Sequence, residues 1–322
     1  MQHNSSDRED DGDAAFWVSY LVNTVTYVVM PFTFVVGTVG NILALKVLVQ
    51  PRYTRTSTGV YMIALEIFDV FVITLFLPVL FVRIVFQEVV VGDAFCQFYV
   101  FLVNVTPLLS NNTLALMSLD RVIVVTFPLR AKSICTTYKA KLCLVILVFV
   151  VIGFSIYRTI PIQMFINSTG KDCDSILVGS VRVITANIQI ALQVWVPFLV
   201  ILVCNVIIVF GLISSAQQRK LLQGPQGSTS SSSGGTSLTV MLVVVSVVFL
   251  LLHIPVVLHR LLRDIHQSGA DAITLNALYW AARALMCLNS AINFFLYMLS
   301  SKQFRSSIFK HNRKSENIEN RI

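Results

Sequence analysis

Residues 118–130 read SLDRVIVVTFPLR and bring Asp120 and Arg121 together at the end of a long apolar run. The run begins near residue 95, which makes it long enough for a helix to cross a bilayer. A charge in the middle of a spanning helix costs about 2.5–3.5 kcal/mol on insertion scales, so each retained charge needs a reason. Asp120 and Arg121 are either an ion pair that reaches toward water at the membrane interface or a functional pair.

Six further apolar runs accompany this one, and the composition is that of a membrane protein. The chain has 322 residues, of which 56% are hydrophobic and only 12% are charged. Backbone groups in lipid must be satisfied within each segment, so the runs are predicted to be helices. The predicted fold class is therefore an all-α membrane protein, a seven-transmembrane helix bundle followed by an amphipathic cytoplasmic eighth helix. The spans are expected at about 19–49, 58–85, 95–126, 141–166, 180–214, 238–262 and 273–299.

Positive charge is unevenly divided between the two sets of connections, and this predicts the orientation. Lys and Arg accumulate in one set and in the C-terminal tail, whereas the N-terminal segment is acidic. Cytoplasmic loops retain positive charge, so the N-terminus is expected outside the plasma membrane and the C-terminus in the cytoplasm. The net charge of +8 then reflects topology, and nucleic-acid binding is not expected because the cations flank apolar spans.

Three segments are expected along the chain. Residues 1–18 form an extracellular tail, residues 19–299 form the seven-transmembrane domain, and residues 300–322 form a cytoplasmic amphipathic helix and tail. Within the domain, the Gly, Ser and Pro content of residues 215–237 predicts a flexible cytoplasmic loop. In the last segment, apolar and basic side chains fall on different helix faces, which is typical of a helix that lies on anionic membrane lipid.

The expected orientation also sorts the modification sites. Asn4 and Asn167 stand in N-x-S/T triplets on segments placed outside, so both are predicted glycosylation sites. Of the six cysteines, only Cys96 and Cys173 face the oxidising side in this topology. They are predicted to form one disulfide that fixes an outer loop to the third span.

The stretch around Arg121 resembles the DRY…PL end of the third helix in rhodopsin-like (class A) G-protein-coupled receptors. Arg121 falls 25 residues after Cys96, which is the separation in that family. The resemblance covers essentially the whole chain, and its wording is most similar to invertebrate FMRFamide-type neuropeptide receptors and molluscan chemosensory receptors. The other matching motifs are Gly40-Asn41, LEIFD at 65–69, Pro197, FLLLHIP at 249–255, NFFLY at 293–297 and Phe304.

The resemblance implies a G-protein switch. In the family the arginine is held by its neighbouring aspartate and released on activation, which gives these roles to Arg121 and Asp120. Asn293 and Tyr297 stand at the switch positions of the seventh helix, and Pro255 stands at the hinge of the sixth. The implied partner is a heterotrimeric G protein, with arrestin and a receptor kinase as further candidates.

The same resemblance implies an allosteric sodium ion. Asp69 is the deepest acid of the chain, and the matched positions place it with Ser110, Asn289 and Asn293, with Asn41 in the same network. Carboxylate, hydroxyl and amide oxygens suit a hard cation, and no other metal or cofactor is expected. Such an ion favours the inactive packing and is expelled on activation. The alternative is a neutral, protonated Asp69 that is hydrogen-bonded within the bundle.

Four positions depart from the family pattern. Val122 stands where a tyrosine is usual, His253 where a tryptophan is usual, and Asn205 where the fifth helix has a tyrosine. His253 is expected to be a hydrogen-bonded core histidine more readily than a proton sensor. Phe294 replaces the seventh-helix proline, so the bend of this helix must come from elsewhere or be smaller.

Single positions narrow the ligand. Val103 occupies the place of the aspartate of amine receptors, and Cys287 that of the lysine a retinal Schiff base needs, so neither ligand is expected. Arginines at the outer helix ends either reach toward headgroups or converge on an acidic ligand, and by resemblance Arg283 faces the ligand cavity. The ligand is predicted to bear an acidic group, such as an acidic side chain of a peptide. The predicted pocket residues are Val103, His253, Arg260, Arg283 and Arg182.

Other classes of protein find little support. The chain has no HExxH or GxSxG motif and no paired intramembrane aspartates, so an enzyme is not expected. A transporter or channel is a remote alternative, because internal repeats and a charged pathway are missing. The predicted function is a receptor that binds an extracellular neuropeptide and activates a G protein, and the alternative is a chemosensory receptor for a small acidic ligand.

Overall fold

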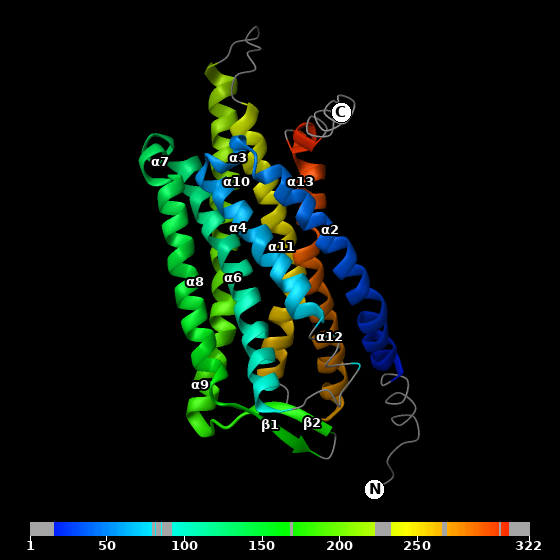
Figure 1. The fold of residues 1–322 in the computed structure, drawn as a ribbon. Coiled ribbons are helices and arrows are strands. Elements are labelled where there is room, and N and C mark those ends of the chain that lie inside the picture. Colours follow the sequence, from blue (N-terminus) through cyan, green and yellow to red (C-terminus); the bar gives the residue numbers. More distant parts are fainter. Residues whose placement is uncertain are drawn as a thin grey trace, which may run out of the picture.

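The computed structural model describes residues 16–78, 81, 85, 92–167, 170–222, 233–265, 269–302 and 304–308. They form a bundle of long helices that run side by side (Figure 1). Six helices are long and apolar enough to cross a membrane, and one bent pair of helices makes a seventh span. The prediction of an all-α bundle of seven spans is therefore confirmed.

Some spans consist of several helical elements, and short helices join some of the spans. The first three are Phe16–Leu48, with η1 (Val25–Val29) and α2 (Met30–Leu48); α4 (Ser57–Phe71) with η2 (Val72–Phe76); and α6 (Asp93–Thr126). The others are α8 (Thr137–Thr159); α9 (Gly179–Ile190), η4 (Ala191–Trp195) and α10 (Val196–Leu222); α11 (Ser233–Ile265); and α12 (Gly269–Ala291) with α13 (Asn293–Ser300). The connecting helices are α3 (Pro51–Thr54) and α7 (Pro128–Ile134).

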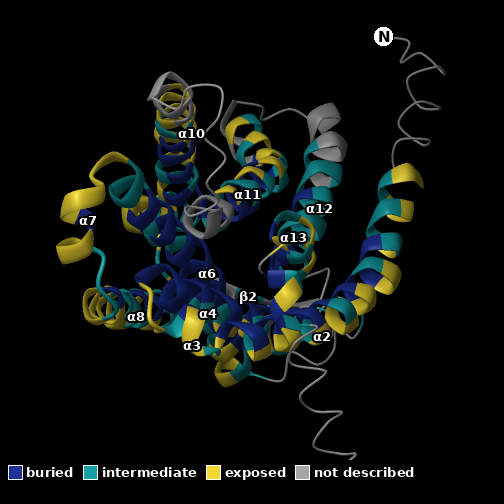
Figure 2. Ribbon diagram, turned by 90° about the horizontal axis from the view of Figure 1, so that it is seen from above, coloured by how far each residue is buried: buried dark blue, intermediate teal, exposed yellow. Residues whose placement is uncertain are grey.

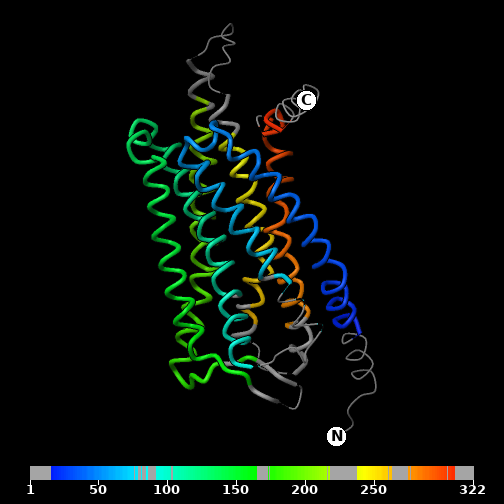
Figure 3. The backbone as a smooth tube through the Cα atoms, in the orientation of Figure 1, coloured from blue at the N-terminus to red at the C-terminus, as the bar shows by residue number. Residues whose placement is uncertain are grey.

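A two-stranded hairpin follows the fourth span at one end of the bundle (Figure 1), where the green tube of Figure 3 turns from the fourth span to the fifth. Strands β1 (Ile162–Asn167) and β2 (Gly170–Ser175) are antiparallel, and Met164 pairs with Cys173. The disulfide between Cys96 and Cys173 is present, with Cα atoms 5.2 Å apart, as predicted. The backbone amide of Met164 also donates to the Asp93 carboxylate at 2.7 Å. We call this end of the bundle the disulfide end, and the opposite end, which carries Arg121, the arginine end.

The predicted boundaries are wrong in two places. The fourth span was expected to reach residue 166, but α8 stops at Thr159 and β1 follows. An apolar run alone does not distinguish a helix from a strand, and Pro161 has no backbone N–H with which to continue the helical hydrogen bonds. Residues 215–237 were expected to form a loop, but α10 and α11 extend into this segment from both sides.

Some predicted features fall on residues that the structure does not describe. These are the tail with Asn4, the centre of the loop at 223–232, and the end of the C-terminal segment after residue 308. Asn167 is the last residue of β1, and its side chain is likewise outside the described part. Glycosylation of both asparagines remains a prediction.

The helix α6 lies at the centre of the bundle, as the view along the helices shows (Figure 2). In its most apolar segment 76% of the residues are buried, against 17% in α8, which lies at the periphery. The largest group of buried apolar residues lies toward the arginine end and includes Met62, Leu114, Phe249, Tyr297 and Phe304. The side chains facing outward are mostly apolar, as a membrane environment requires.

Glycines bring the first span close to the seventh. A Cβ atom added to Gly37 would lie 2.8 Å from the Cβ of Ala291, and one added to Gly40 would lie 3.3 Å from the Cβ of Phe294. Small residues allow helix backbones to approach closely in membranes. The approach places Asn41, the neighbour of Gly40, against the seventh span.

The seventh span bends by 56° between α12 and α13 although it lacks the proline. The side-chain amide of Asn41 donates to the backbone carbonyl of Ser290 at 2.9 Å. In a continuous helix this carbonyl accepts from the amide of Phe294, four residues on. Insertion of a side chain into the helical hydrogen bonds is a known cause of a kink. The bend therefore comes from another source than proline, which is one of the two outcomes that the sequence allowed.

The described part of the eighth helix packs back onto the bundle. Phe304 is fully buried, and its ring lies 5.4 Å from the ring of Tyr297 and 6.2 Å from that of Phe294. Arg305 donates to the carbonyl oxygens of Met298 and Leu299 at 2.6 and 2.9 Å. The helix is thus fixed to the end of the seventh span by one apolar and one charged side chain.

Candidate functional site

A buried carboxylate on the second span, Asp69, joins three spans. Its Oδ1 accepts from the Ser110 hydroxyl on α6 at 2.7 Å, and its Oδ2 accepts from the Asn293 amide on α13 at 2.7 Å. Hydrogen bonds to a charged group are worth about 1.5–3 kcal/mol each. The structure thus brings together three of the residues predicted for the sodium site.

A small cavity lies next to this carboxylate. Its volume is about 20 Å³, and its lining includes Ser110, Asn289, Ser290 and His253. A cavity of roughly 10–15 Å³ is the minimum that holds one water molecule. The space is therefore large enough for one water or one small ion. Asn41 reaches this region only through the carbonyl of Ser290.

The residues around the cavity fit a small hard cation. Sodium would be held by oxygens of Asp69 and Ser110, with Asn289 nearby, and it would supply a positive charge that compensates the buried carboxylate. Within the described part of the chain, no group of three or more His, Cys, Asp or Glu side chains is arranged to hold a metal. The chemistry of the site is thus that of oxygen ligands around a single carboxylate.

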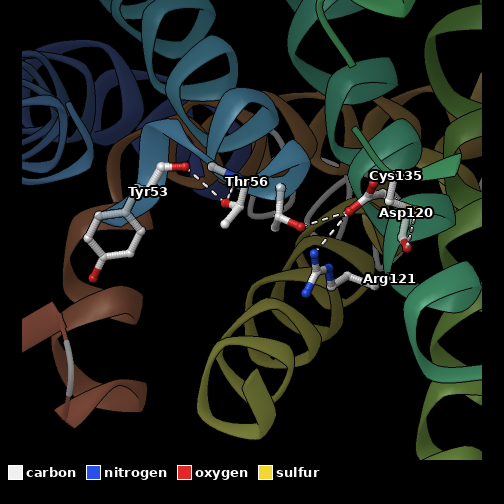
Figure 4. A network of polar contacts seen from close by, with 7 residues as sticks. Tyr53, Thr56, Asp120, Arg121 and Cys135 are labelled. Carbon is white, nitrogen blue, oxygen red and sulfur yellow. Dashed lines mark hydrogen bonds and ion pairs between the residues drawn. The ribbon is translucent and has the colours of Figure 1, made fainter. Parts of the chain in front are cut away.

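At the arginine end, Asp120 holds Arg121 (Figure 4). The Arg121 Nη2 lies 3.0 Å from the Asp120 Oδ2, and the two side chains are 8% and 6% exposed. The same Oδ2 accepts from the hydroxyl of Thr58 at 2.7 Å. The thiol of Cys135 lies 3.8 Å from the backbone carbonyl of Asp120. The predicted pair is therefore formed, and two residues that the sequence did not indicate support it.

Two groups in the connections at this end have shifted pKa values. Burial raises the pKa of the Cys135 thiol to about 11, and the nearby Asp120 acts in the same direction. Burial also raises the pKa of the Tyr53 hydroxyl, against the lowering effect of Ser307 and a nearby arginine. Both groups therefore stay protonated at neutral pH.

The other predicted switch residues lie on separate helices. Tyr297 is fully buried on α13, and its hydroxyl makes no hydrogen bond with the described residues. Pro255 lies inside α11, where it removes the backbone donor that would bond to Leu251 and weakens the helix at that point. Asn205 is buried on α10, and neither polar atom of its side chain has a hydrogen-bond partner in the described chain.

A larger cavity opens toward the disulfide end between the fifth, sixth and seventh spans. Its volume is about 200 Å³, and polar and apolar side chains share its lining. Among the described residues of this lining, Arg283 and His259 are the ones that can carry a charge. The residues that line it are Gln189, Gln193, Val194, Val256, His259, Tyr279, Ala282, Arg283 and Met286.

Arg283 is held in this cavity by a neutral partner. Its Nε and Nη2 both donate to the Tyr279 hydroxyl, at 3.0 and 2.8 Å, and its guanidinium carbon lies 5.1 Å from the centre of that ring. The imidazole of His259 lies 5.5 Å from the same ring. The phenol hydroxyl accepts both hydrogen bonds and positions the guanidinium at the wall of the cavity.

The other predicted pocket residues occupy different places. His253 is buried, stacks on Phe249 at 3.9 Å, and lines the small cavity near Asp69 instead of the larger one. Its Nδ1 lies 2.9 Å from the Phe249 carbonyl, which makes it the hydrogen-bonded core histidine that the sequence favoured. Arg182 is exposed on α9. The side chains of Val103 and Arg260 lie outside the described part of the structure.

Sequence reasoning missed a polar network behind the larger cavity. Arg158 on α8 donates to the Thr185 hydroxyl at 3.0 Å and to the Gln189 side-chain oxygen at 2.9 Å, both on α9. The Gln189 amide in turn donates to the side chain of Asn104 on α6. The signal in the sequence was Arg158 itself, a charge within an apolar run. The other members of the network lie on the fifth and third spans, and no fixed spacing along the sequence connects them to Arg158.

Two asparagines of α6 fix the wide turn that carries Gln193. Asn111 donates to the Gln193 carbonyl at 2.9 Å, and Asn112 donates to the Leu192 carbonyl at 3.1 Å. Both carbonyls belong to the π-helix η4, where the wider winding changes the usual backbone pairing. The central helix thereby determines the shape of one wall of the cavity.

The bundle has seven spans, three of which are joined at one buried carboxylate, with a cavity toward one end and an ion-paired arginine toward the other, which is the architecture of a membrane signalling receptor. The chain belongs to the 7 transmembrane receptor (rhodopsin family), because the model of this family matches residues 40–297. It is thus a multi-pass membrane protein of a family of signalling receptors, and not an enzyme. The predicted class is confirmed.

Curated relatives agree with this assignment. Growth hormone secretagogue receptor type 1 of Oryctolagus cuniculus is 27% identical over 286 residues, which cover 86% of this chain and 77% of the relative. Galanin receptor 2b of Danio rerio is 30% identical over 150 residues, 44% of this chain and 40% of the relative. The GQ-coupled rhodopsin of Mizuhopecten yessoensis is 32% identical over 111 residues, 34% and 22% of the two chains.

Proposed function

We propose that this chain is a plasma-membrane receptor whose disulfide end faces outward, binds an extracellular peptide through an acidic group, and activates a heterotrimeric G protein. The observation that carries the ligand chemistry is Arg283, a guanidinium held by a phenol in a cavity of about 200 Å³. A carboxylate that enters the cavity can accept two parallel hydrogen bonds from such a group. Two of the relatives are named as receptors for a growth hormone secretagogue and for galanin, which supports an extracellular messenger as the ligand.

The cavity wall formed by the fifth span favours a peptide as the ligand. Gln189 and Gln193 line the cavity from the fifth span, and amide side chains can donate to or accept from a peptide backbone. Arg158 and Asn104 hold Gln189 in position, so the amide is oriented before the ligand arrives. A fixed geometry lowers the entropy cost of binding.

The ligand is best sought with a peptide library on cells that express the chain, read by calcium and cyclic AMP. Active peptides are then compared in acid and amide forms, Asp against Asn and Glu against Gln. In Arg283→Ala we expect a potency loss on the order of 100-fold for acid forms and little preference between the two forms. Arg182→Ala, which removes an exposed arginine of the same end, is the matched control. Unchanged potency in Arg283→Ala would remove the proposed ligand chemistry.

The volume of the cavity favours one second candidate. Typical ligand pockets measure about 300–1,000 Å³, so a cavity of about 200 Å³ accommodates a side chain or a small molecule. A chemosensory receptor for a small carboxylic acid would need no more space. If free amino acids or short-chain carboxylates activate the chain and no peptide does, this alternative replaces the peptide receptor.

Orientation and coupling need their own tests. The basic residues at the arginine end support a cytoplasmic location for Arg121 and the eighth helix. An epitope at the N-terminus should be accessible on intact cells, and Asn167→Gln should remove a glycan. Ligand-dependent nucleotide exchange on a panel of Gα subunits tests the coupling, and phosphorylation and recruitment assays test arrestin and a receptor kinase. Ion flux in proteoliposomes without nucleotide exchange would point to a channel.

The sodium site is a further part of this proposal. Sodium compensates Asp69 in the resting state, so it should lower agonist affinity in the wild type. Asp69→Asn should abolish this sodium effect, and Ser110→Ala should weaken it. Titration of agonist binding with sodium against the same concentrations of potassium gives the measurement. Equal effects of the two cations would exclude a specific site.

A further inference from the structure

A second carboxylic acid, Glu66, lies in the second span close to Asp69. Its side chain is fully buried, and neither of its carboxyl oxygens makes a hydrogen bond with the described residues. Glu66 precedes Asp69 by three residues on α4, so the two lie on the same side of the helix. Burial of an unpaired charge in such a place costs far more than burial of a neutral acid. Glu66 is therefore a neutral carboxylic acid, and its hydrogen-bonding capacity needs a partner.

The residues of the Asp69 centre do not supply this partner. Both oxygens of Asp69 already accept, from Ser110 and from Asn293. Asn41 donates to the carbonyl of Ser290. The carboxyl of Glu66 thus stands beside the polar centre without being part of its hydrogen bonds.

The group that faces Glu66 is the hydroxyl of Tyr297 on α13. Asn293 donates to Asp69 at 2.7 Å, Glu66 lies one turn before Asp69 on α4, and Tyr297 lies one turn after Asn293 on α13. The second and seventh spans run in opposite directions, so the two side chains lie at the same level of the bundle, and neither makes a hydrogen bond with the described residues in this conformation. Tyr297 is also fully buried, and its ring is fixed against Phe304 of the eighth helix. The Glu66 carboxyl and the Tyr297 hydroxyl are thus two buried polar groups on neighbouring helices, each without a hydrogen bond in the described chain.

Burial of the Glu66 carboxyl or of the Tyr297 hydroxyl without a partner costs free energy, and a hydrogen bond between the two would remove this cost. A buried hydroxyl or carboxyl without a partner carries its whole desolvation penalty, whereas a pair of them restores the lost hydrogen bond. A change of side-chain rotamer would let the bond close, because the hydrogen bond between Asn293 and Asp69 holds the two helices together one turn away. The bond would connect the second span to the last turns of the seventh, next to the point where the eighth helix begins.

We propose that Glu66 is a positioning residue for the receptor switch: as a neutral acid it pairs with the Tyr297 hydroxyl and holds α13 and the eighth helix against the second span in the resting state. This is the arrangement in which Asp120 holds Arg121. The inference rests on G-protein signalling by this family, and it is independent of the ligand. Movement of Tyr297 away from Glu66 would then accompany activation.

The test is a double-mutant cycle on the full-length receptor. The variants are Glu66→Leu, Tyr297→Phe and the double variant, with Glu66→Gln as the conservative replacement. The readouts are the thermal midpoint of the purified receptor and ligand-independent nucleotide exchange on a Gα subunit. Each single replacement leaves one polar group unpaired, so it should lower the midpoint by roughly 3–6 °C and raise basal exchange about fivefold.

The double variant distinguishes a pair from two separate contributions. With both polar groups removed no unsatisfied atom remains, so the midpoint should be no lower than in the worse single variant. Glu66→Gln keeps a neutral hydrogen-bonding group and should restore basal exchange to near the wild-type level. A merely structural role for Glu66 would not give this recovery of basal exchange.

Tyr53→Phe is the matched control. The hydroxyl of Tyr53 is also buried and lacks a hydrogen bond, but the side chain that it faces is Ser307. Its effect should therefore add to that of Glu66→Leu. Additive effects of Glu66→Leu and Tyr297→Phe, or a Glu66→Leu receptor with unchanged basal exchange, would overturn the proposal.

An infrared measurement keeps the proposal testable if the leucine variant does not fold. A neutral Glu66 contributes a carboxylic-acid carbonyl band that Glu66→Gln removes. In Tyr297→Phe the same band should move to higher frequency, because the carbonyl loses its hydrogen bond. A band that is unaffected by Tyr297→Phe would show that the two groups are not paired.

Discussion

The two ends of the bundle each contain an arginine, and the two arginines have different partners. At the arginine end, the guanidinium of Arg121 has a carboxylate partner, and the same carboxylate oxygen also accepts from Thr58. At the disulfide end, Arg283 has a phenol as its partner, and an open cavity lies beside it. A guanidinium held by a carboxylate is fixed in one conformation, whereas a guanidinium beside an open cavity can be reached by a molecule that enters the cavity. In the function proposed above, the first end holds the resting state and the second end receives the ligand.

Packing follows the same division. The largest apolar core lies toward the arginine end and contains Tyr297 and Phe304, both with no exposed surface. The cavity of about 200 Å³ lies toward the other end, and it has polar walls. A closely packed region changes between discrete conformations. A cavity with a few fixed polar groups is selective for the molecules that fit it.

The largest effect is expected when Arg121 loses its carboxylate partner. Asp120→Ala leaves Arg121 buried without a carboxylate, which costs about 3–5 kcal/mol for a buried pair. The equilibrium should shift toward the state with a free arginine by on the order of 100-fold, seen as basal nucleotide exchange on Gα in proteoliposomes. Asp93→Ala, which removes an acid at the disulfide end, is the control and should leave basal exchange unchanged. Unchanged exchange in Asp120→Ala would mean that the pair does not hold the resting state.

The second prediction concerns the thiol beside that pair. Burial raises the pKa of Cys135 from 9.0 to about 11, so at pH 8 its thiolate fraction is about 100-fold lower than that of an ordinary cysteine. Alkylation by iodoacetamide, followed by mass spectrometry, should be slower by a similar factor and rise about tenfold per pH unit until the pH approaches 11. The same cysteine in the denatured chain provides the reference rate. Equal rates in the folded and denatured chains would contradict the buried environment.

The third prediction tests whether the disulfide end also contains a structural charge. Arg158→Met removes hydrogen bonds to Thr185 and Gln189 and should lower the stability by about 2 kcal/mol, measured by thermal unfolding of the purified receptor. Arg130→Met, at an exposed position of α7, should change the stability by less than about 0.5 kcal/mol. If both variants unfold like the wild type, the network contributes nothing to the fold.

The smallest effect sharpens the view of the arginine end. Thr58→Val removes one of two hydrogen bonds to the Asp120 carboxylate, worth about 1 kcal/mol, and should raise basal exchange about fivefold. Thr26→Val is the control, because the buried hydroxyl of Thr26 has no hydrogen bond to lose in the described chain. A larger change in Thr26→Val than in Thr58→Val would contradict the assigned role of Thr58.

Much of this architecture could be predicted because the membrane imposes simple rules. Span length, loop charge and topology gave the seven helices and the disulfide between Cys96 and Cys173, and matched motifs brought Asp69, Ser110 and Asn293 to one point. These features depend on residue type at a fixed place along a helix. They require no knowledge of how neighbouring helices are rotated.

What escaped prediction depends on contacts between helices. The partners of Arg158 come from α9, the support for Asp120 comes from Thr58, and the kink comes from Asn41 in another span. The end of the fourth span failed for a local reason, because the apolar residues of β1 resemble the continuation of a helix. Pro161 is the local signal for this end, since it has no backbone N–H with which to continue the helix.

The bend at Ser290 has a mechanical consequence. A proline ring is a permanent break, since the missing amide cannot be restored. Here the carbonyl of Ser290 accepts from the Asn41 amide, and the backbone amide of Phe294 is chemically able to take the place of this donor. Exchange of one donor for another changes the free energy by only about 1 kcal/mol. The bend of the seventh span can therefore change at a small cost in free energy. The side-chain amide of Asn41 on the first span determines how easily it changes.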